Sequence, residues 1–263
     1  MSNQVIHHLQ HLTKLLEQAE SSKKSIKPLT EVHPDLTVDE AYQIQLQMIG
    51  QKVQTGQRIV GKKIGLTSVA MQQLLGVDQP DYGHLLDSME VSNNGTILLD
   101  DLFQPKVEGE IAFILNKDLI GPNVTVEEVL DATESIAPAL EIVDSRIMDW
   151  KITLADTVAD NASSGMFVIG DERYKVTDLD LRSIELKLFK NGELINTGFG
   201  YDVLGHPAKC VAWLANKLSQ YNVVLKAGEV ILSGALSAAV PAVKGDRFTA
   251  GFSHIGMAEV NFK

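Results

Sequence analysis

Cysteine is almost absent from this chain of 263 residues, which contains Cys210 alone. No disulfide can therefore form within the chain, and this is typical of the reducing cytoplasm, where we expect the protein to act. Cys210 lies in the apolar run 210–215, which favours a buried, inert thiol over a nucleophile.

Long apolar runs are lacking as well. None approaches the roughly 20 residues that span a bilayer. His7, His8 and Gln10 interrupt the apolar residues near the start, which excludes the apolar core of a signal peptide. Basic residues are outnumbered, and the net charge of -11 argues against long nucleic acids and anionic membranes as partners. A small anionic substrate is still compatible with this charge, because the local field of a site can oppose it.

The sequence signatures of three enzyme classes are missing. There is no G-x-G-x-x-G, no Walker A and no G-x-S-x-G pattern, which argues against a Rossmann fold, a P-loop and an α/β-hydrolase. Hydrophobic residues make up 44% of the chain and charged residues 22%, as in ordinary globular proteins.

Apolar periodicity divides the chain into an α-rich N-terminal region, residues 1–75, and a strand-rich region, residues 76–263. For the first region we expect a helix over about 4–24, a second helix that begins at the capping box of Thr37 and Glu40, and a short third helix through Met71 and Leu74-Leu75.

The strand-rich region alternates apolar and polar residues with turn signals between them. We expect strands over 106–115, 136–146, 184–190, 229–234, 247–252 and 257–262, helices from Thr125 and over 207–221, and hairpin turns at Asn93–Gly95 and Asn191-Gly192. This mixture predicts an α+β fold built as a mixed β-roll.

Two carboxylates, Glu108 and Glu110, lie within the strand expected over 106–115. Residues two apart in a strand point to the same face, and two like charges side by side cost free energy unless a cation or a proton lies between them. Taken alone, the pair is better explained as a solvent-facing acidic pair than as half of a metal site.

Glu141 changes this balance, because it lies in the middle of the apolar run 136–143. A carboxylate in such a run must be paired, protonated or bound to a cation. Three carboxylates on adjacent strands suit Mg²⁺ or Mn²⁺ rather than zinc. The residues therefore predict a metal site of Glu108, Glu110 and Glu141.

Two further residues have an open interpretation. Lys63, between Gly61 and Gly65, is equally well explained as a site cation and as an edge-strand lysine that discourages aggregation. Asp81 lies in the turn-rich segment 77–84, where a turn residue is the default, but Pro80 before it could fix its direction.

Several ordered motifs resemble the hydratase/decarboxylase branch of the fumarylacetoacetate hydrolase superfamily, from about residue 35 to the end of the chain. They are GKKIGLTS (61–68), QPDYG (79–83), EGE (108–110), PALEIVDSR (138–146) and ADNASSG (159–165). The resemblance implies a mixed β-roll, a site lysine at Lys63, an acid at Asp81, and Mg²⁺ or Mn²⁺ on the three glutamates. Ser164, Ser233 and Gly234 are the expected contacts to the substrate carboxylate.

The family implies a small 2-oxo or 2-hydroxy-dienoic acid as substrate. Hydration of 2-hydroxypenta-2,4-dienoate (2-oxopent-4-enoate) to 4-hydroxy-2-oxopentanoate in meta-cleavage catabolism is the expected activity, and Asp81 favours it. The alternative activity is decarboxylation of 2-oxo-3-hexenedioate (4-oxalocrotonate). The segment Ala238–Pro241 favours this alternative, because it resembles the corresponding segment of the decarboxylases. The direct passage from Arg146 to Asp156 favours a substrate with one carboxylate.

A third interpretation is a non-catalytic partner subunit. The retained glutamates, Lys63 and Asp81 argue against it, because a subunit freed from chemistry has no physical need for a buried acidic cluster. The resemblance further implies a homo-oligomer that could associate with a decarboxylase or aldolase of the same pathway.

Overall fold

Helices form most of the first part of the chain. The computed structural model describes residues 3–68, 72–73 and 76–263, and the predicted short helix through Met71 and Leu74-Leu75 lies mostly outside them. The opening helices are α1 (Asn3–Ser22), α2 (Leu29–Val32) and α3 (Val38–Gln54). The predicted capping box is confirmed: the Thr37 side chain accepts from the Glu40 amide, and the Glu40 carboxylate accepts from the Thr37 amide.

Among the described residues, eight strands form a curved sheet in the order β2-β1-β10-β5-β6-β7-β3, with β11 paired to β5. Pairing is parallel for β1–β10 and β3–β7 and antiparallel elsewhere, which confirms a mixed sheet. The strands are β1 (Ile59–Gly65), β2 (Asp81–Leu86), β3 (Glu90–Val91), β5 (Lys106–Leu115), β6 (Thr133–Val143), β7 (Ser164–Ile169), β10 (Val230–Leu232) and β11 (Val240–Pro241).

A second sheet has the order β4-β13-β12-β8-β9. Its strands are β4 (Gly95–Ile97), β8 (Glu185–Lys190), β9 (Glu193–Phe199), β12 (Arg247–Phe252) and β13 (Gly256–Phe262). It packs against the back of β5: a Cβ added to Gly109 would lie 2.7 Å from Cδ1 of Leu186. Gly109 therefore allows the two sheets to approach closely behind the glutamates.

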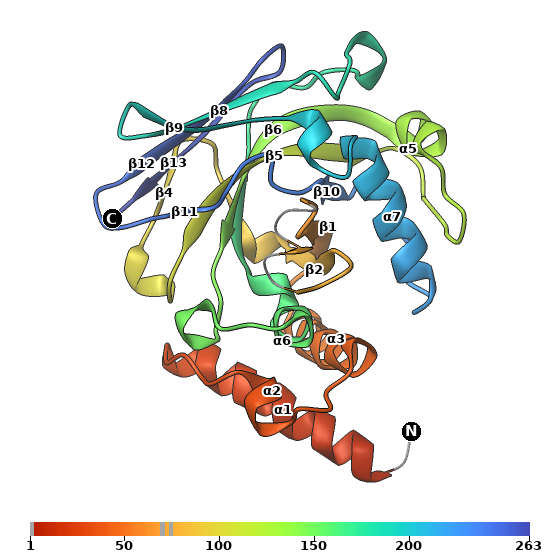
Figure 1. The fold of residues 1–263 in the computed structure, drawn as a ribbon, viewed down its shortest axis with the longest axis vertical. Coiled ribbons are helices and arrows are strands. Elements are labelled where there is room, and N and C mark those ends of the chain that lie inside the picture. Colours follow the sequence, from red (N-terminus) through yellow and green to blue (C-terminus); the bar gives the residue numbers. More distant parts are fainter. Residues whose placement is uncertain (1–2, 69–71, 74–75) are drawn as a thin grey trace.

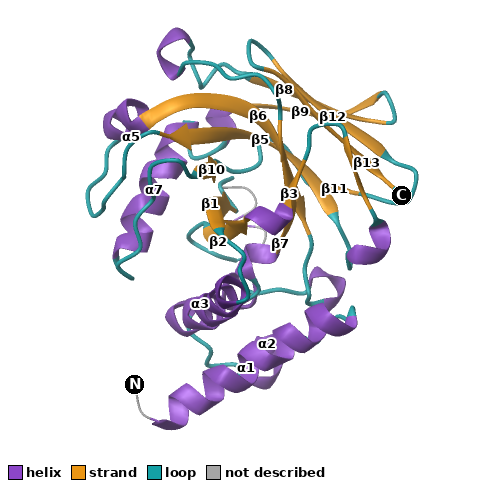
Figure 2. Cartoon of the chain, turned by 180° about the vertical axis from the view of Figure 1, so that it is seen from behind, coloured by secondary structure: helices purple, strands orange, loops and turns teal. Residues whose placement is uncertain are grey.

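The remaining helices are α5 (Val126–Ala132), α6 (Leu154–Ala159) and α7 (Pro207–Ser219). Figure 1 shows β1 and β2 as short strands between the long curved β5 and β6 on one side and helices α3 and α6 on the other. Figure 2 shows the same arrangement from behind, with α1 on the outer side of α3. The inner strands are thus enclosed by chain from both predicted regions.

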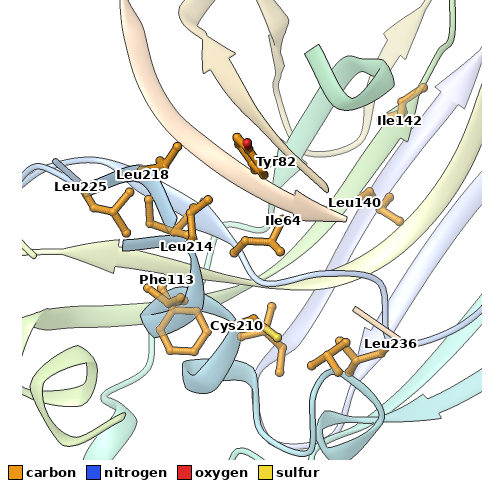
Figure 3. Packing of buried hydrophobic residues seen from close by; sticks show 14 of the residues in the cluster. Ile64, Tyr82, Phe113, Leu140, Ile142, Cys210, Leu214, Leu218, Leu225 and Leu236 are labelled. Atoms are coloured by element: carbon orange, nitrogen blue, oxygen red, sulfur yellow. The ribbon is translucent and has the colours of Figure 1, made fainter. Parts of the chain in front are cut away.

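Helix α7 closes the core beside these strands. In Figure 3, Leu214 and Leu218 of α7 lie next to Ile64 and Tyr82 of the inner strands. Cys210 is fully buried in the same cluster, and burial raises the pKa of its thiol, which confirms the interpretation as an inert core residue.

Three predictions need comment. The turn at Asn93–Gly95 exists, with the Gly95 amide bonded to Ser92, but the hairpin is wrong, because β3 pairs with β7 and β4 with β13. The hairpin at Asn191-Gly192 is confirmed by the β8–β9 pair. The division at residue 75 stays a prediction, and β1 from the first region pairs with β2 and β10 of the second.

No helix in the described ranges is long and apolar enough to cross a membrane.

Candidate active site

The three predicted metal ligands lie together on two neighbouring strands of the larger sheet, β5 and β6. Glu108 and Glu141 are register partners in the antiparallel pair of β5 and β6, and Glu110 is two residues further along β5. One carboxylate oxygen from each residue lies within 4.8 Å of the other two. Alternation along one strand and register between two strands therefore assemble a three-carboxylate cluster.

Burial raises the pKa of all three groups above the ordinary value of a glutamate. The pKa of Glu108 rises to about 8, through burial and the neighbouring Glu141. The pKa of Glu110 is raised well above its ordinary value by burial and then by Glu141, while burial raises that of Glu141 against the opposing charge of Lys63. Without a cation, this cluster therefore retains protons that a solvated glutamate would lose.

The cluster fits a divalent metal ion. Oε1 of Glu110 and Oε2 of Glu141 are buried and have no hydrogen-bond partner. Carboxylate oxygens with unused lone pairs are the ligands that hard divalent cations prefer. The other oxygen of Glu110 accepts from the Gly234 amide at 2.7 Å. Gly234, predicted to contact substrate, therefore holds a carboxylate in place.

Lys63 faces the cluster from β1. Its Nζ lies 3.3 Å from Oε1 of Glu141 and 3.9 Å from Oδ1 of Asp81. Burial opposes its charge, but the surrounding carboxylates, Glu141 first among them, together outweigh burial and raise the pKa of this lysine above its ordinary value. β1 is hydrogen bonded on both sides, so the edge-strand interpretation of Lys63 is wrong.

Asp81 is the first residue of β2 and is buried, so the turn-rich segment expected over 77–84 ends before Asp81 and the turn-residue interpretation is wrong. Its Oδ2 accepts a hydrogen bond from the Thr157 hydroxyl at 2.8 Å, while its Oδ1 has no hydrogen-bond partner. A Cβ added to Gly65 would lie 2.2 Å from that Oδ1. Only glycine at position 65 leaves room for this carboxylate.

Lys63, Asp81 and Glu108 line one cavity of about 180 Å³. Its polar lining includes Lys63, Asp81, Glu108, Thr157 and Ser163, and its apolar lining consists of Val143, Trp150, Ile152 and Ala162 together with Ala239. A neighbouring pocket of about 460 Å³ shares the residues Gly65, Leu66, Lys106, Glu108 and Ala239 with it. The site can therefore hold a small acid, with adjoining space for a chain extension.

The predicted Ser164 lines a different pocket, of about 190 Å³, whereas Ser163 lines the cavity of Asp81 and Glu108. The Ser163 hydroxyl is buried without a partner, and residues Asn161, Ala162 and Ser163 have positive φ angles of 52°, 50° and 53°. Such strain costs on the order of 1 kcal/mol per residue and persists where surrounding contacts enforce it. Here the Asn161 side chain exchanges two hydrogen bonds with the His84 main chain.

Sequence reasoning missed Ser163 because the small and polar residues of segment 156–165 are typical of a loop and do not distinguish Ser163 from Ser164. The structure has helix α6 there, followed by the left-handed residues. The available signal was a capping box, in which Thr153 and Asp156 exchange hydrogen bonds at the start of α6. Ser233 is buried beside Gly234 with an unpaired hydroxyl, and its predicted contact to substrate stays a prediction.

Comparison with known proteins adds an independent finding. Residues 82–263 match the family described as "Fumarylacetoacetate (FAA) hydrolase C-terminal". The chain is 50% identical to a 2-hydroxyhexa-2,4-dienoate hydratase of Comamonas testosteroni, over 94% of each chain. It is 47% identical to a 2-keto-4-pentenoate hydratase of Paraburkholderia xenovorans, over 94% of this chain and 92% of that protein.

Among solved structures, the chain is similar to a 4-oxalocrotonate decarboxylase from Pseudomonas putida G7 complexed with magnesium and adipate. The TM-score is 0.95 with 35% sequence identity, over 98% of both chains. A divalent metal is thus bound by a protein of closely similar fold, and the two hydratases are more similar in sequence to this chain than this decarboxylase is.

Proposed function

Because this chain belongs to the fumarylacetoacetate hydrolase family, we propose that it is a hydro-lyase that adds water to 2-hydroxypenta-2,4-dienoate (2-oxopent-4-enoate) and yields 4-hydroxy-2-oxopentanoate. The observation that carries the proposal is the buried Asp81, which lines the same cavity as Glu108 and has one carboxylate oxygen without a hydrogen-bond partner. Identity of 47–50% to two hydratases over nearly the whole chain supports it. Enzyme names among these relatives argue against a non-catalytic subunit.

The substrate offers a carboxylate and an adjacent C2 oxygen. A divalent cation, for which we propose Mg²⁺ or Mn²⁺, supplies a Lewis acid for the charge on that C2 oxygen when Glu108, Glu110 and Glu141 hold it. Lys63 contributes a second positive charge on the same side of the cavity. Val143, Trp150 and Ile152 give the cavity an apolar wall that suits the hydrocarbon part of the substrate.

Asp81 is the group that moves protons. The reaction first transfers the proton of the 2-hydroxyl to C5, which gives the 2-oxo-3-enoate. Water then adds with its oxygen at C4, and one of its protons reaches C3. In our proposal Asp81, through Oδ1, delivers the proton at C5 and removes a proton from the attacking water. Ser163 adds a free hydroxyl in the same cavity, in place of the predicted Ser164.

Decarboxylation of 2-oxo-3-hexenedioate is a second candidate, and one observation favours it. The TM-score of 0.95 to the decarboxylase complexed with magnesium and adipate indicates the same overall arrangement of chain. Because hydratases and decarboxylases share the fold, the fold does not choose between the two reactions.

Product analysis with both acids tests the proposal. Incubation with 2-hydroxypenta-2,4-dienoate and Mg²⁺ should give 4-hydroxy-2-oxopentanoate, and incubation with 2-oxo-3-hexenedioate should release little carbon dioxide. Rapid carbon dioxide release without hydration would overturn the proposal in favour of the decarboxylase. Mass spectrometry in H₂¹⁸O should place the label at C4.

The metal site is tested by Glu141→Ala, which should abolish metal-dependent activity and weaken metal binding, measured by calorimetry on the chelator-treated protein. Glu134→Ala is the matched control, because Glu134 lies on the same strand β6 but is exposed. Full metal affinity in Glu141→Ala would contradict the three-carboxylate site.

The setting of the enzyme also belongs to the proposal. We expect a homo-oligomer in the cytoplasm, associated with a decarboxylase or aldolase of the same aromatic meta-cleavage pathway. The support is that relatives of this chain are hydratases and decarboxylases that act on related acids. Sedimentation of the purified chain, alone and with those partners, measures both associations.

A further inference from the structure

The two oxygens of Asp81 have different surroundings. Oδ2 accepts the Thr157 hydroxyl at 2.8 Å, and Oδ1 has no hydrogen-bond partner and lies 3.9 Å from Nζ of Lys63. Thr157 is buried, with 2% of its surface exposed, and lines the same cavity as Asp81. One oxygen is therefore fixed by the protein, while the other remains available to a ligand.

The direction of the Thr157 hydroxyl is unusual for a threonine within a helix. Such a threonine commonly donates to the carbonyl four residues earlier. Thr157 belongs to α6, and its amide does bond to the Thr153 carbonyl. Its single hydroxyl proton, however, goes to Asp81 on a different element. The bond thus joins α6 to β2 at the site.

A second contact holds the same two elements together next to this bond. Nε2 of Gln45 in α3 donates to the carbonyls of Tyr82 and Val158, at 3.0 and 2.6 Å. These two residues immediately follow Asp81 and Thr157 in the sequence. Gln45 is fully buried, and its Oε1 lies 2.8 Å from Nδ1 of His84. The clamp of Gln45 therefore fixes the backbones that carry the pair.

We propose that Thr157 is a positioning residue for the hydration reaction: its hydroxyl, held in register by Gln45, fixes Oδ2 of Asp81 as a hydrogen-bond acceptor, so that the proton is delivered and received at Oδ1. This inference rests on the role proposed for Asp81. Because Oδ2 already accepts a hydrogen bond from Thr157, a protonated Asp81 carries its proton on Oδ1, the oxygen that has no hydrogen-bond partner in the protein. Proton transfer is sensitive to such placement, since it requires the reacting atoms at hydrogen-bond distance.

The test compares Thr157→Val, which keeps the shape but removes the donor, with Thr157→Ser, which keeps the donor. A hydrogen bond to a charged group is worth enough that Thr157→Val should lower kcat roughly 10- to 100-fold. KM for the dienoate and the affinity for Mg²⁺ should change less than about threefold, because neither depends on the direction of Asp81. Thr157→Ser should recover kcat to within about threefold.

Thr13→Val is the matched control for loss of a buried threonine hydroxyl. Thr13 is 1% exposed in α1, and its hydroxyl donates within α1 and to Gln47 of α3, away from the cavity. Its kcat should equal that of the unmodified enzyme. Urea unfolding of all variants confirms that activities are compared among folded proteins.

A double-mutant cycle with Asp81→Asn separates this inference from the proposed function. If Thr157 acts through Asp81, adding Thr157→Val to Asp81→Asn should change the remaining activity less than about twofold. Three outcomes would overturn the positioning role alone. They are an equal loss of activity from Thr157→Val in the unmodified enzyme and in Asp81→Asn, an unchanged kcat in Thr157→Val, and a failure of Thr157→Ser to recover activity. Unchanged turnover of Asp81→Asn would instead overturn the role of Asp81.

Discussion

Lys62 and Lys63 are consecutive residues of β1, and they face opposite sides of the same sheet. Nζ of Lys62 lies 2.7 and 2.6 Å from the two oxygens of Glu229, so this buried pair satisfies itself. Nζ of Lys63 lies 3.3 Å from one oxygen of Glu141, in a cluster that keeps buried oxygens without partners. Lys62 and Glu229 are thus paired with each other, whereas the charged groups around Lys63, on the opposite face, include oxygens without a partner.

The charges of the two lysines are tuned in opposite directions. Burial lowers the pKa of Lys62 despite the compensating charge of Glu229. The pKa of Lys63 is raised, because several carboxylates together outweigh its burial. A closed pair can be exchanged for apolar side chains, whereas an open cluster needs a ligand to balance it. We therefore expect the Lys62 face to contribute mainly to stability and the Lys63 face to the proposed reaction.

Lys63→Met should have the largest effect, a fall in kcat/KM between about 10³- and 10⁴-fold, because it removes the protein cation next to the developing charge. Steady-state kinetics with saturating Mg²⁺ measures the loss, and circular dichroism checks that the variant is folded. If Lys63→Met kept kcat/KM within tenfold of the unmodified enzyme, the Lys63 face would not differ from the Lys62 face in its contribution to catalysis.

Lys62→Met tests the opposite face and should lower the free energy of unfolding by about 3–5 kcal/mol, since it leaves Glu229 buried without its partner. Urea unfolding measures this change. The double variant Lys62→Met/Glu229→Leu should recover most of the stability, and kcat of the folded enzyme should stay within about threefold in both. A large loss of kcat in Lys62→Met would show that this face contributes to catalysis.

His84 should give a smaller, pH-dependent effect on the Lys62 face, where it is the register partner of Lys62. Burial, with the charge of Lys62, lowers its pKa to about 3 from 6.5. The unfolded state therefore binds a proton below pH 6.5 that the folded state does not. The stability from neutral His84 is fully present above pH 6.5 and is lost as the pH falls toward 3.

Between pH 6.5 and 5, His84 alone should lower the free energy of unfolding by at most about 1.4 kcal/mol per pH unit. The measurement is the difference in urea unfolding between the unmodified chain and His84→Gln at each pH, because the buried glutamates titrate in both proteins. Parallel pH profiles would contradict the buried, neutral state of His84.

Lys106→Met should have the smallest effect, on the Lys63 face. Nζ of Lys106 lies 4.1 Å from the centre of the Trp150 ring, and Lys106 lines both pockets near the glutamates. A cation–π contact is worth about 1 kcal/mol, so KM should rise about three- to fivefold with little change in kcat. Lys217→Met is the matched control, because Lys217 lies 5.9 Å from the Tyr82 ring centre and does not line these pockets. A fall in kcat would give Lys106 a more direct role.

The acidic cluster could be predicted from sequence because local rules determine it. Strand alternation puts Glu108 and Glu110 on one face, and the apolar run around Glu141 requires a partner for it. The pairing of Lys63 and Asp81 depends on the register of β1 with β2, in which Gly65 lies opposite Asp81. That register cannot be predicted from local residue patterns.

Helix α6 was missed for a related reason. Its six residues are too few to be helical by propensity, and contacts from afar hold it: Asp156 accepts from the amide and hydroxyl of Thr30. The Asn93–Gly95 segment led to the opposite error. Its residues correctly predicted a turn, but the strands on either side join different sheets and so do not form a hairpin. In both cases long-range contacts determined what local patterns could not.

The family match begins at residue 82 and contains all three glutamates, whereas Lys63 and Asp81 precede it. The proposed metal ligands thus come from a different stretch of the chain from the site cation Lys63 and the proposed proton-transfer residue Asp81. Mutation can therefore alter Lys63, Asp81 or the α3 clamp without touching the metal ligands. For a lineage of enzymes, such a separation is a route by which an inherited metal site can acquire new reactions.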